Sequence, residues 1–449
     1  MTNLNMKTLG AILLVPLLGA PTSLYAAETL LSLYQAALQY DAQYKTTVAN
    51  TQADREEVNK AVALFYPKAQ ITGSIGRGET DRTTQTLSSA VDAHLRYDTK
   101  NLAFTIKQPL FNKEILANYK GAQAFVKSKE ALLQAENSSL ITRIASAYFE
   151  LLYAQEKSTV VQNKTDALQQ QLNQATQRYK HDEGTLTEIS EAQASLDIAQ
   201  AELIEAENAT DSFRITLSNM TGHAVESLAK LNPEKITSIK ADFEHVEPWL
   251  QKAIDNNPEI MAAKLTVEEA QQNVEKKQAG HYPTLDLVGL RSYSENDSNN
   301  TLGSRFDSTT IALQFSMPLY AGGGVQASVR QSLDKVEAAK EDLNLKTRDA
   351  STNIQKYFQR LQSEMRSIQA YSQAVKSSEL ALDGTSKSFK AGFRTNIDVL
   401  NAQQKLYENK LNLSKSYYVL INDVVNIQHF AGVLNETQLQ NLNQFFFVN

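Results

Sequence analysis

Residue types that usually carry chemistry are sparse in this chain of 449 residues and do not gather into a site. The six histidines are scattered and show no His-Glu-x-x-His spacing, so a zinc hydrolase has no ligand set here. The chain has no cysteine, which excludes thiolate metal sites and cysteine nucleophiles. No Gly-x-Ser-x-Gly motif marks a serine nucleophile. We therefore expect neither catalysis nor a metal or cofactor.

A run of three glycines, Gly322 to Gly324, stands before a predicted helix, where backbone amides could hold a phosphate. No Gly-Lys-Ser or Gly-Lys-Thr follows, so the run does not match a nucleotide-binding loop. We instead interpret Gly322 and Gly323, with Pro109 and Pro318, as shaping a bend between strand and helix, since proline fits a helix's first turn. A net charge of −6 also argues against nucleic acid as a partner.

The predicted secondary-structure elements form an internal sequence repeat. Tyr66-Pro67 returns as Tyr282-Pro283, and the segment 107–111 returns as 316–320. The third match pairs Arg178-Tyr179-Lys180, Thr185 and Glu188 with Ser388-Phe389-Lys390, Thr395 and Asp398. Each copy reads as a helix, two strands, a very long helix, a turn and a long helix. We predict two repeats, 28–221 and 248–431, with a linker at 222–247 and a C-terminal segment at 432–449 packed outside the helices.

The N-terminus has the layout of a secretory signal peptide over residues 1–27. Lys7 precedes an apolar run from Leu9 to Ala20, and small residues follow as far as Ala27. The run is too short to cross a bilayer as a helix, although a membrane anchor is the alternative interpretation. The mean hydropathy of −0.38 is too polar for a helical membrane protein. We expect an exported chain in which strands make any membrane crossing.

Two segments alternate between apolar and polar residues, as membrane strands do. In Asn101 to Gln108 the residues Leu102, Phe104 and Ile106 alternate with polar or small ones, and Thr310 to Ser316 repeats the pattern. Lengths near ten residues and aromatic residues at the strand ends suit a tilted membrane strand. A half-buried sheet in a soluble sandwich is the alternative.

Long helices with heptad spacing follow each strand pair. Apolar residues recur in steps of three and four from Leu133 to Tyr179 and from Leu333 to Leu382, with shorter return helices at 186–221 and 396–431. The first helices of the repeats are expected to break near Tyr40-Asp41 and at Asn257-Pro258. A simple coiled-coil rod is the alternative, and the strand pairs argue against it.

Two strand pairs give four strands per chain, too few to close a barrel. A sheet in lipid has to close, because open edges leave backbone groups without partners. Membrane barrels begin at about eight strands, and an eight-stranded interior is filled by side chains. If the protein conducts, three copies with twelve strands are therefore favoured.

This layout resembles the TolC family of outer-membrane channel-tunnels over the whole mature chain. The most specific match is Phe389 to Leu400, similar to the family's aromatic-x-x-Gly-x-Arg-x-x-x-Asp-Val-Leu tip segment. Met317 to Gly323 resembles its strand-to-helix junction, and Gly432 to Glu436 its C-terminal Gly-x-Leu-x-Glu.

The resemblance implies an α+β membrane protein with the TolC-like fold. Three identical chains would share a twelve-strand β-barrel in the outer membrane of a Gram-negative bacterium. An α-helical coiled-coil barrel would continue it across the periplasm. Its partners would be a periplasmic adaptor (membrane fusion) protein, an inner-membrane ABC or proton-driven transporter, and outer-membrane lipid.

A finer resemblance concerns the cargo. Glu183 to Glu188, followed by Glu191 to Ala194, resembles the branch that serves type I protein secretion. Multidrug efflux, or a periplasmic coiled-coil structural protein without a pore, are the alternatives.

The resemblance also implies a gate at the helical tip. Arg394 would pair with Glu188 on the neighbouring tip helices, while Phe389 stands where some members carry a tyrosine, so a hydroxyl bond is lost. The pore constriction would be formed by Asp398 and Asn401, and Asn401 stands where some members carry a second acidic residue. One ring of three carboxylates would then attract cations.

Overall fold

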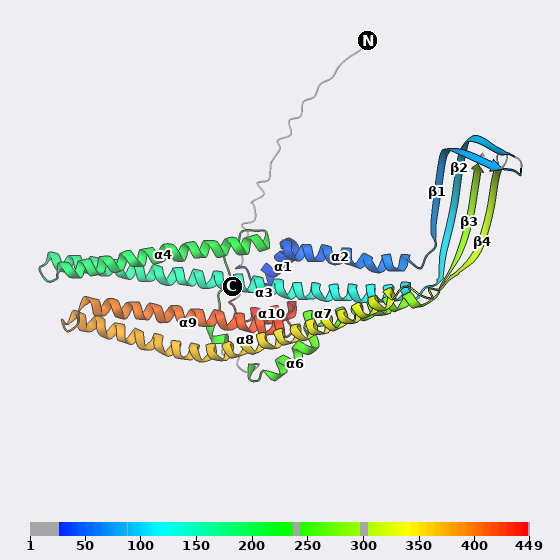
Figure 1. Cartoon of the computed structure of the whole chain (residues 1–449). Helices are drawn as coiled ribbons and strands as arrows, with labels where there is room; N and C mark the ends of the chain where they lie inside the picture. The colour runs from blue at the N-terminus through cyan, green and yellow to red at the C-terminus, as the bar shows by residue number, and fades with distance from the viewer. Residues whose placement is uncertain (1–26, 88, 237–242, 297–303, 448–449) are drawn as a thin grey trace, which may run out of the picture.

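The computed structural model describes residues 27–87, 89–236, 243–296 and 304–447. Over these residues the chain is long and thin, with a sheet at one end and paired helices reaching to the other (Figure 1). The predicted signal peptide, apart from Ala27, and part of the predicted linker lie outside the described residues.

Each repeat opens with two helices, and both breaks fall where the sequence predicts them. Helix α1 spans Leu30–Tyr40 and α2 spans Ala42–Ala63; their counterparts are α6, Glu247–Asn256, and α7, Pro258–Gln278. Asp41 caps α2 by accepting a hydrogen bond from the Tyr44 amide at 2.8 Å. Asn257 caps α7 in the same way, and Pro258 occupies the first helical position, where no N–H is needed.

The four strands form one antiparallel sheet in the order β1-β2-β3-β4. They span Lys68–Gln85, Ala90–Phe111, Thr284–Asn296 and Ser304–Ser316. The predicted length of about ten residues is wrong for the first hairpin, whose strands have 18 and 22 residues. In its outer part β1 is mostly polar, and the apolar residues of β2 lie on the face opposite to that of Leu102, Phe104 and Ile106, so the pattern of the inner strands does not continue into it. Among the described residues, β1 and β4 each pair along one edge only.

The strand register gives the sheet one apolar face and one mostly polar face. The apolar face carries Ala69, Ile71, Gly73, Ile75, Leu102, Phe104, Ile106, Leu285, Leu287, Gly289, Ile311, Leu313 and Phe315, with Gln108 near its helix end and Lys100, Arg291, Glu295, Asp307 and Thr309 toward its outer end. The opposite face carries Gln70, Thr72, Ser74, Asn101, Thr105, Lys107, Asp286, Ser292, Thr310 and Gln314, interrupted by Ala103, Val288, Leu290 and Ala312. Lys107 and Asp286 form an ion pair of 2.8 Å there. This two-sided pattern is typical of a sheet with lipid on one side and water on the other.

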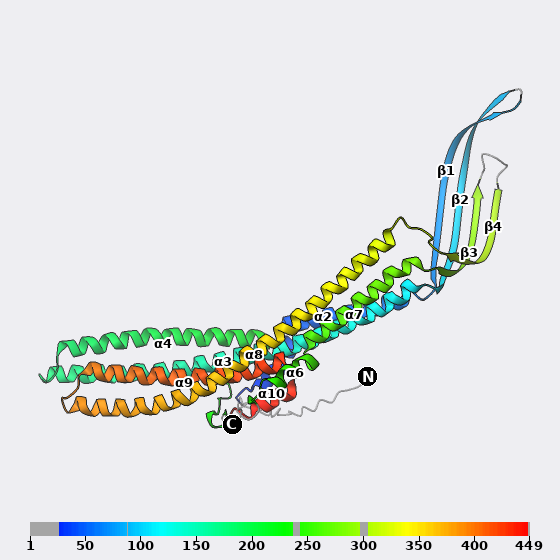
Figure 2. The same cartoon turned by 60° about the horizontal axis from the view of Figure 1, so that its bottom comes forward.

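Two helical hairpins make up the other end of the molecule (Figure 2). The first joins α3, Lys113–Lys180, to α4, Leu186–Thr221; the second joins α8, Gly324–Lys390, to α9, Asn396–Phe430. The predicted return helices are confirmed to within a residue, and the two long helices extend beyond the predicted heptad runs at both ends. Helix α3 has 68 residues, about 100 Å at 1.5 Å per residue. None of the described helices carries an apolar stretch long enough to cross a membrane.

A belt midway along the helices contains the main hydrophobic core. Tyr148 and Phe149 of α3 are buried there, and the ring of Phe446 stacks on Phe149 with centroids 6.1 Å apart. Short bridges pair Glu28 with Leu228 and Leu231 with Phe446. The C-terminal segment, expected to lack periodic structure, contains the eight-residue helix α10, Glu436–Asn443. A helix of two turns shows too little periodicity to be predicted from its sequence.

Candidate functional site at the helical tip

The two helical hairpins end in turns of the same geometry, 210 residues apart. In the first turn the Glu183 amide donates to the Arg178 carbonyl at 2.9 Å, and in the second the Phe393 amide donates to the Ser388 carbonyl at 2.9 Å. The left-handed position is Gly392 in the second turn, with φ +82°, and Asp182 in the first, with φ +58°. Aspartate tolerates this conformation better than most residues. The duplication therefore extends to the backbone of the tip.

The next helix begins in the same way after each turn, with a threonine N-cap. The Thr185 hydroxyl accepts from the Glu188 amide at 3.1 Å, and the Thr395 hydroxyl accepts from the Asp398 amide at 3.4 Å. Glu188 and Asp398 thus hold the equivalent third position of their helices, where a negative charge is favourable near the helix N-terminus.

The two carboxylates then differ in what they contact. Asp398 completes a capping box, accepting from the Thr395 amide at 2.9 Å and from its hydroxyl at 2.8 Å. Arg394 lies 3.7 Å from the same carboxylate. The hydrogen bonds from Thr395, assisted by the charge of Arg394, lower the pKa of Asp398. Glu188 instead faces Arg178, whose guanidinium lies 3.7 Å from its carboxylate.

Arg178 is the residue that joins the two turns. It donates to the Glu183 carbonyl at 3.0 Å, and its guanidinium carbon lies 4.9 Å from the centre of the Phe389 ring on α8. This cation–π contact engages the ring of Phe389, the residue that stands where some members of the resembled family carry a tyrosine. No role was predicted for Arg178 from the sequence, although it belongs to the repeated segment, in which Ser388 is the equivalent residue of the second copy.

Near the tip, a buried amide pair also crosses between the hairpins. Gln171 of α3 donates to the Asn396 side chain at 2.6 Å, and both residues are buried. Leu168, Leu196, Ala199 and Leu400 form a small apolar cluster beside them. Asn401, predicted at the pore constriction, lines a shallow groove of about 80 Å³ with residues of α3 and α4. Neither Gln171 nor Asn396 was predicted, because no motif distinguishes a buried amide pair.

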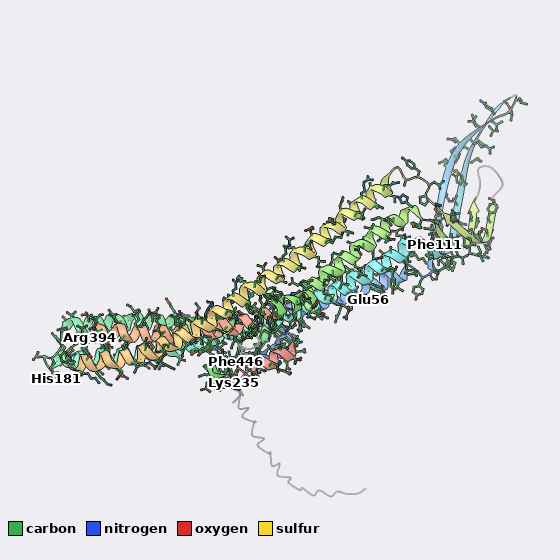
Figure 3. All side chains as sticks on the ribbon, turned by 90° about the horizontal axis from the view of Figure 1, so that it is seen from below. Glu56, Phe111, His181, Lys235, Arg394 and Phe446 are labelled. Carbon is green, nitrogen blue, oxygen red and sulfur yellow. The ribbon has the colours of Figure 1, made fainter. Side chains whose placement is uncertain are left out.

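Arg394 lies at this end of the molecule, far from the sheet (Figure 3), and the other predicted tip residues lie in the helix ends next to the two turns. Within one chain, however, Arg394 contacts Asp398 and Glu188 contacts Arg178, and the predicted pairing of Arg394 with Glu188 is not made within the chain. That pairing remains a prediction for contacts between copies.

At the sheet end, Pro318, Gly322 and Gly323 lie between β4 and α8, whereas Pro109 lies near the end of β2, and the expectation that the prolines fit a helix's first turn is wrong. Pro109 lies within β2, beside a register shift towards β3, and Pro318 lies between β4 and α8, so neither occupies a first helical turn. Gly322 and Gly323 have φ of +58° and +80°, which favours glycine. A Cβ at either glycine would meet nothing within 4 Å, so conformation rather than space requires glycine.

None of the described residues form a group of histidine, aspartate and glutamate side chains able to hold a metal ion. The tip instead offers a cation–π contact and a buried amide hydrogen bond between the two helical hairpins of the chain. A family model described as "Outer membrane efflux protein" matches residues 33–223 and 249–433, one match for each repeat. The chain belongs to the outer membrane efflux protein family.

Among its curated relatives in this family is the alkaline protease secretion protein AprF of Pseudomonas aeruginosa. The two are 28% identical over 413 residues, which cover 92% of this chain and 86% of AprF. The outer membrane protein TolC of Vibrio cholerae is 27% identical over 441 residues, covering 98% of each chain. The resemblance to the TolC family is thus confirmed.

Solved structures of outer-membrane channels show the same fold. CusC superposes with a TM-score of 0.76 at 16% identity, covering 91% of this chain and 95% of that one. VceC of Vibrio cholerae gives 0.74 at 21% identity, covering 90% and 96%. The outer membrane efflux protein family is a transport family, and the chain is an outer-membrane protein of a Gram-negative bacterium whose helices extend into the periplasm. Channels of this family work in tripartite systems with an adaptor and an inner-membrane transporter.

Proposed function

We propose that three copies of this chain form the exit duct of a type I protein secretion system. Four strands with an open edge on β1 and another on β4 support this assembly most directly. Because an open edge in lipid leaves backbone groups unpaired, β4 of one copy pairs with β1 of the next. Three copies give twelve strands with the polar face inward.

Protein cargo is favoured over small molecules by two relatives and by the tip sequence. AprF is named for alkaline protease secretion, and PrtF of Dickeya chrysanthemi, 27% identical over 440 residues, is named a proteases secretion protein. Glu183 to Glu188 resembles the tip of that branch. Small-molecule efflux is the second candidate, because the outer membrane efflux protein BepC of Brucella suis is 24% identical over 419 residues.

The duct is passive, and its partners supply the energy. We expect a periplasmic adaptor to contact the tip turns and an inner-membrane ABC transporter to deliver the cargo. In the closed tip, Asp398 and Asn401 line the constriction, and Arg394 meets Glu188 of the next copy.

A single cysteine at the tip tests this function, since the chain has none of its own. Ala391→Cys places an exposed thiol in the second turn for crosslinking in living cells, and Gln326→Cys, exposed at the other end of α8, is the matched control. We expect Ala391→Cys alone to capture an adaptor belonging to an ABC exporter. An adaptor of a proton-driven drug pump would replace protein secretion by efflux. No adaptor, with the protein absent from the membrane, would contradict the duct.

A further inference from the structure

The first hairpin continues well beyond the sheet that the four strands share. Pairing between β2 and β3 stops at Thr99 and Asn296, whereas β1 and β2 remain paired as far as Gln85 and Ala90. We call residues 77–85 and 90–98 the outer ribbon. Nine residues on each strand give it a length of about 30 Å at 3.3 Å per residue. Figure 1 shows its end bending away from the direction of the strands.

The faces of the outer ribbon can be followed from the shared sheet because the register between β1 and β2 has no shift. Ile71 opposes Phe104, Ile75 opposes Lys100, Arg77 opposes Asp98 and Asp81 opposes His94, all on one side. Thr72, Ser74, Gly78 and Thr80 and their partners lie on the other side. The ribbon therefore has a face continuous with the apolar side of the sheet and a face continuous with its polar side.

The polarity of both faces changes toward the outer ribbon, and on the first face the change begins within the shared sheet, where Lys100 pairs with Glu295 and Arg291 with Asp307. The face that is apolar in the sheet becomes charged, with Arg77 pairing with Asp98 at 2.8 Å and Arg96 with Glu79 at 3.0 Å. His94 contacts Glu79 and Asp81 on the same face. Paired and exposed charges of this kind suit a surface in contact with water.

The face that is polar in the sheet becomes apolar along β2 of the ribbon, whereas its β1 side stays mostly polar. Val91, Ala93, Leu95 and Tyr97 occupy it along β2, with Thr80, Arg82 and Thr84 opposite. Ala93, Leu95 and Tyr97 are half-buried within a single chain, whereas every charged residue on the other face is exposed. The Tyr97 ring lies on Gly78, where an added Cβ would come within 2.4 Å of it. Glycine at position 78 therefore leaves room for the Tyr97 ring to lie flat on the ribbon, on the same side as Leu95 and Ala93.

We infer that the outer ribbons of three copies pack their apolar faces together above the barrel and narrow its outer mouth. This inference rests on the proposed trimer, in which the polar face of the sheet lines the lumen. The apolar face of each ribbon continues that lining and points toward the threefold axis. An apolar face in water is unfavourable unless covered. Because symmetry brings the same face of the other two copies to this axis, the partner that fits is a second copy of this chain.

Neighbouring cysteines on opposite faces of the ribbon test the inference. Leu95→Cys lies on the apolar face and Arg96→Cys, one residue on, lies on the charged face. After mild oxidation of intact cells, we expect Leu95→Cys to form disulfide-linked dimers and Arg96→Cys to stay monomeric on denaturing gels. Equal crosslinking of the two variants, or none in Leu95→Cys, would overturn the packing.

A measurement of the oligomeric state separates this inference from the proposed function. Native mass spectrometry of the unmodified chain reports whether the trimer forms. A trimer whose Leu95→Cys thiols do not crosslink overturns the ribbon packing and leaves the duct intact, whereas a chain that forms no trimer overturns both. In planar bilayers, we expect oxidised Leu95→Cys to conduct less than its reduced form. Identical currents in the two forms would contradict narrowing of the mouth.

Discussion

The guanidinium of Arg178, at the end of α3, lies over the ring of Phe389, at the end of α8, with 4.9 Å between the guanidinium carbon and the ring centre. Arg178 also faces Glu188 and holds the Glu183 carbonyl, so one side chain joins the first turn to the second hairpin. A gate that opens by separating these hairpins has to break this contact.

Removing Arg178 is therefore expected to favour the open tip. A cation–π contact at a partly exposed site contributes about 0.5–1 kcal/mol, so Arg178→Ala should shift the closed-to-open equilibrium about two- to fivefold per chain. Single-channel conductance in planar bilayers measures the shift. Arg178→Lys keeps the charge but loses the planar stacking, so its conductance should lie in between. Closed-state conductance in Arg178→Ala equal to that of the unmodified channel would exclude this role.

Asp398→Asn is expected to lower the cation selectivity of the closed channel, because it removes the proposed ring of three carboxylates. The hydrogen bonds that lower the Asp398 pKa keep this carboxylate ionised to lower pH than an ordinary aspartate. Selectivity should accordingly persist on acidification below the usual aspartate range. Reversal potentials in a salt gradient provide the measurement.

Asp398 also caps α9, and a matched variant separates this role from that of the ring. Thr395→Ala removes the capping hydroxyl and leaves the carboxylate in place. It should weaken the start of α9 by about 1 kcal/mol without a loss of cation selectivity. If both variants lose selectivity equally, Asp398 acts through the cap rather than as a ring.

The repeat made most of the fold predictable, since each helix–strand–helix unit could be checked against its copy. The helix breaks at Asp41 and Asn257 follow from local capping chemistry, which sequence carries directly. The contacts across the tip do not follow from local chemistry. Arg178 meets Phe389 only after two hairpins 210 residues apart pack side by side, and nothing local in either segment specifies that pairing. The outer ribbon was missed for another reason: its polarity is inverted relative to a membrane strand.

A buried ion pair between α8 and α9, next to the core of the belt, is expected to control the stability of the second hairpin. The Asp423 side chain on α9 is fully buried. Its carboxylate accepts from the Arg360 Nε on α8, which lies 2.8 Å from both oxygens, and from the Arg360 Nη2, while the Arg360 side chain is 41% exposed. Arg360→Ala leaves this carboxylate without its partner and should cost about 3 kcal/mol of stability, the low end of the range for a broken buried pair.

Thermal unfolding followed by circular dichroism checks this cost. The double variant Arg360→Leu with Asp423→Leu serves as the control, because replacing both charges removes the unpaired carboxylate. It should be more stable than Arg360→Ala. A double variant as unstable as the single one would show that the loss comes from packing and not from charge.

Two histidines near the belt are expected to make stability depend on pH in opposite directions. Burial lowers the pKa of His429, whose Nδ1 lies 2.7 Å from the Ser138 hydroxyl. The unfolded chain then binds this proton more tightly, so stability is lost as pH falls below the unfolded value of about 6.5. His223 pairs with Glu28 at 2.9 Å, and this hydrogen bond raises its pKa. Its contribution is present below the unfolded value and lost as pH rises through the raised value.

Melting temperatures between about pH 5 and 8 separate the two histidines, since this is the range in which histidine changes charge. His429→Gln keeps a side chain able to bond Ser138 but cannot take up a proton, so its melting temperature should fall less on acidification than that of the unmodified protein. His223→Gln should instead flatten the alkaline side of the profile. The two variants should therefore change opposite sides of the pH profile. If His429→Gln changed the alkaline side and His223→Gln the acidic side, burial would not lower the pKa of His429 and the bond to Glu28 would not raise that of His223.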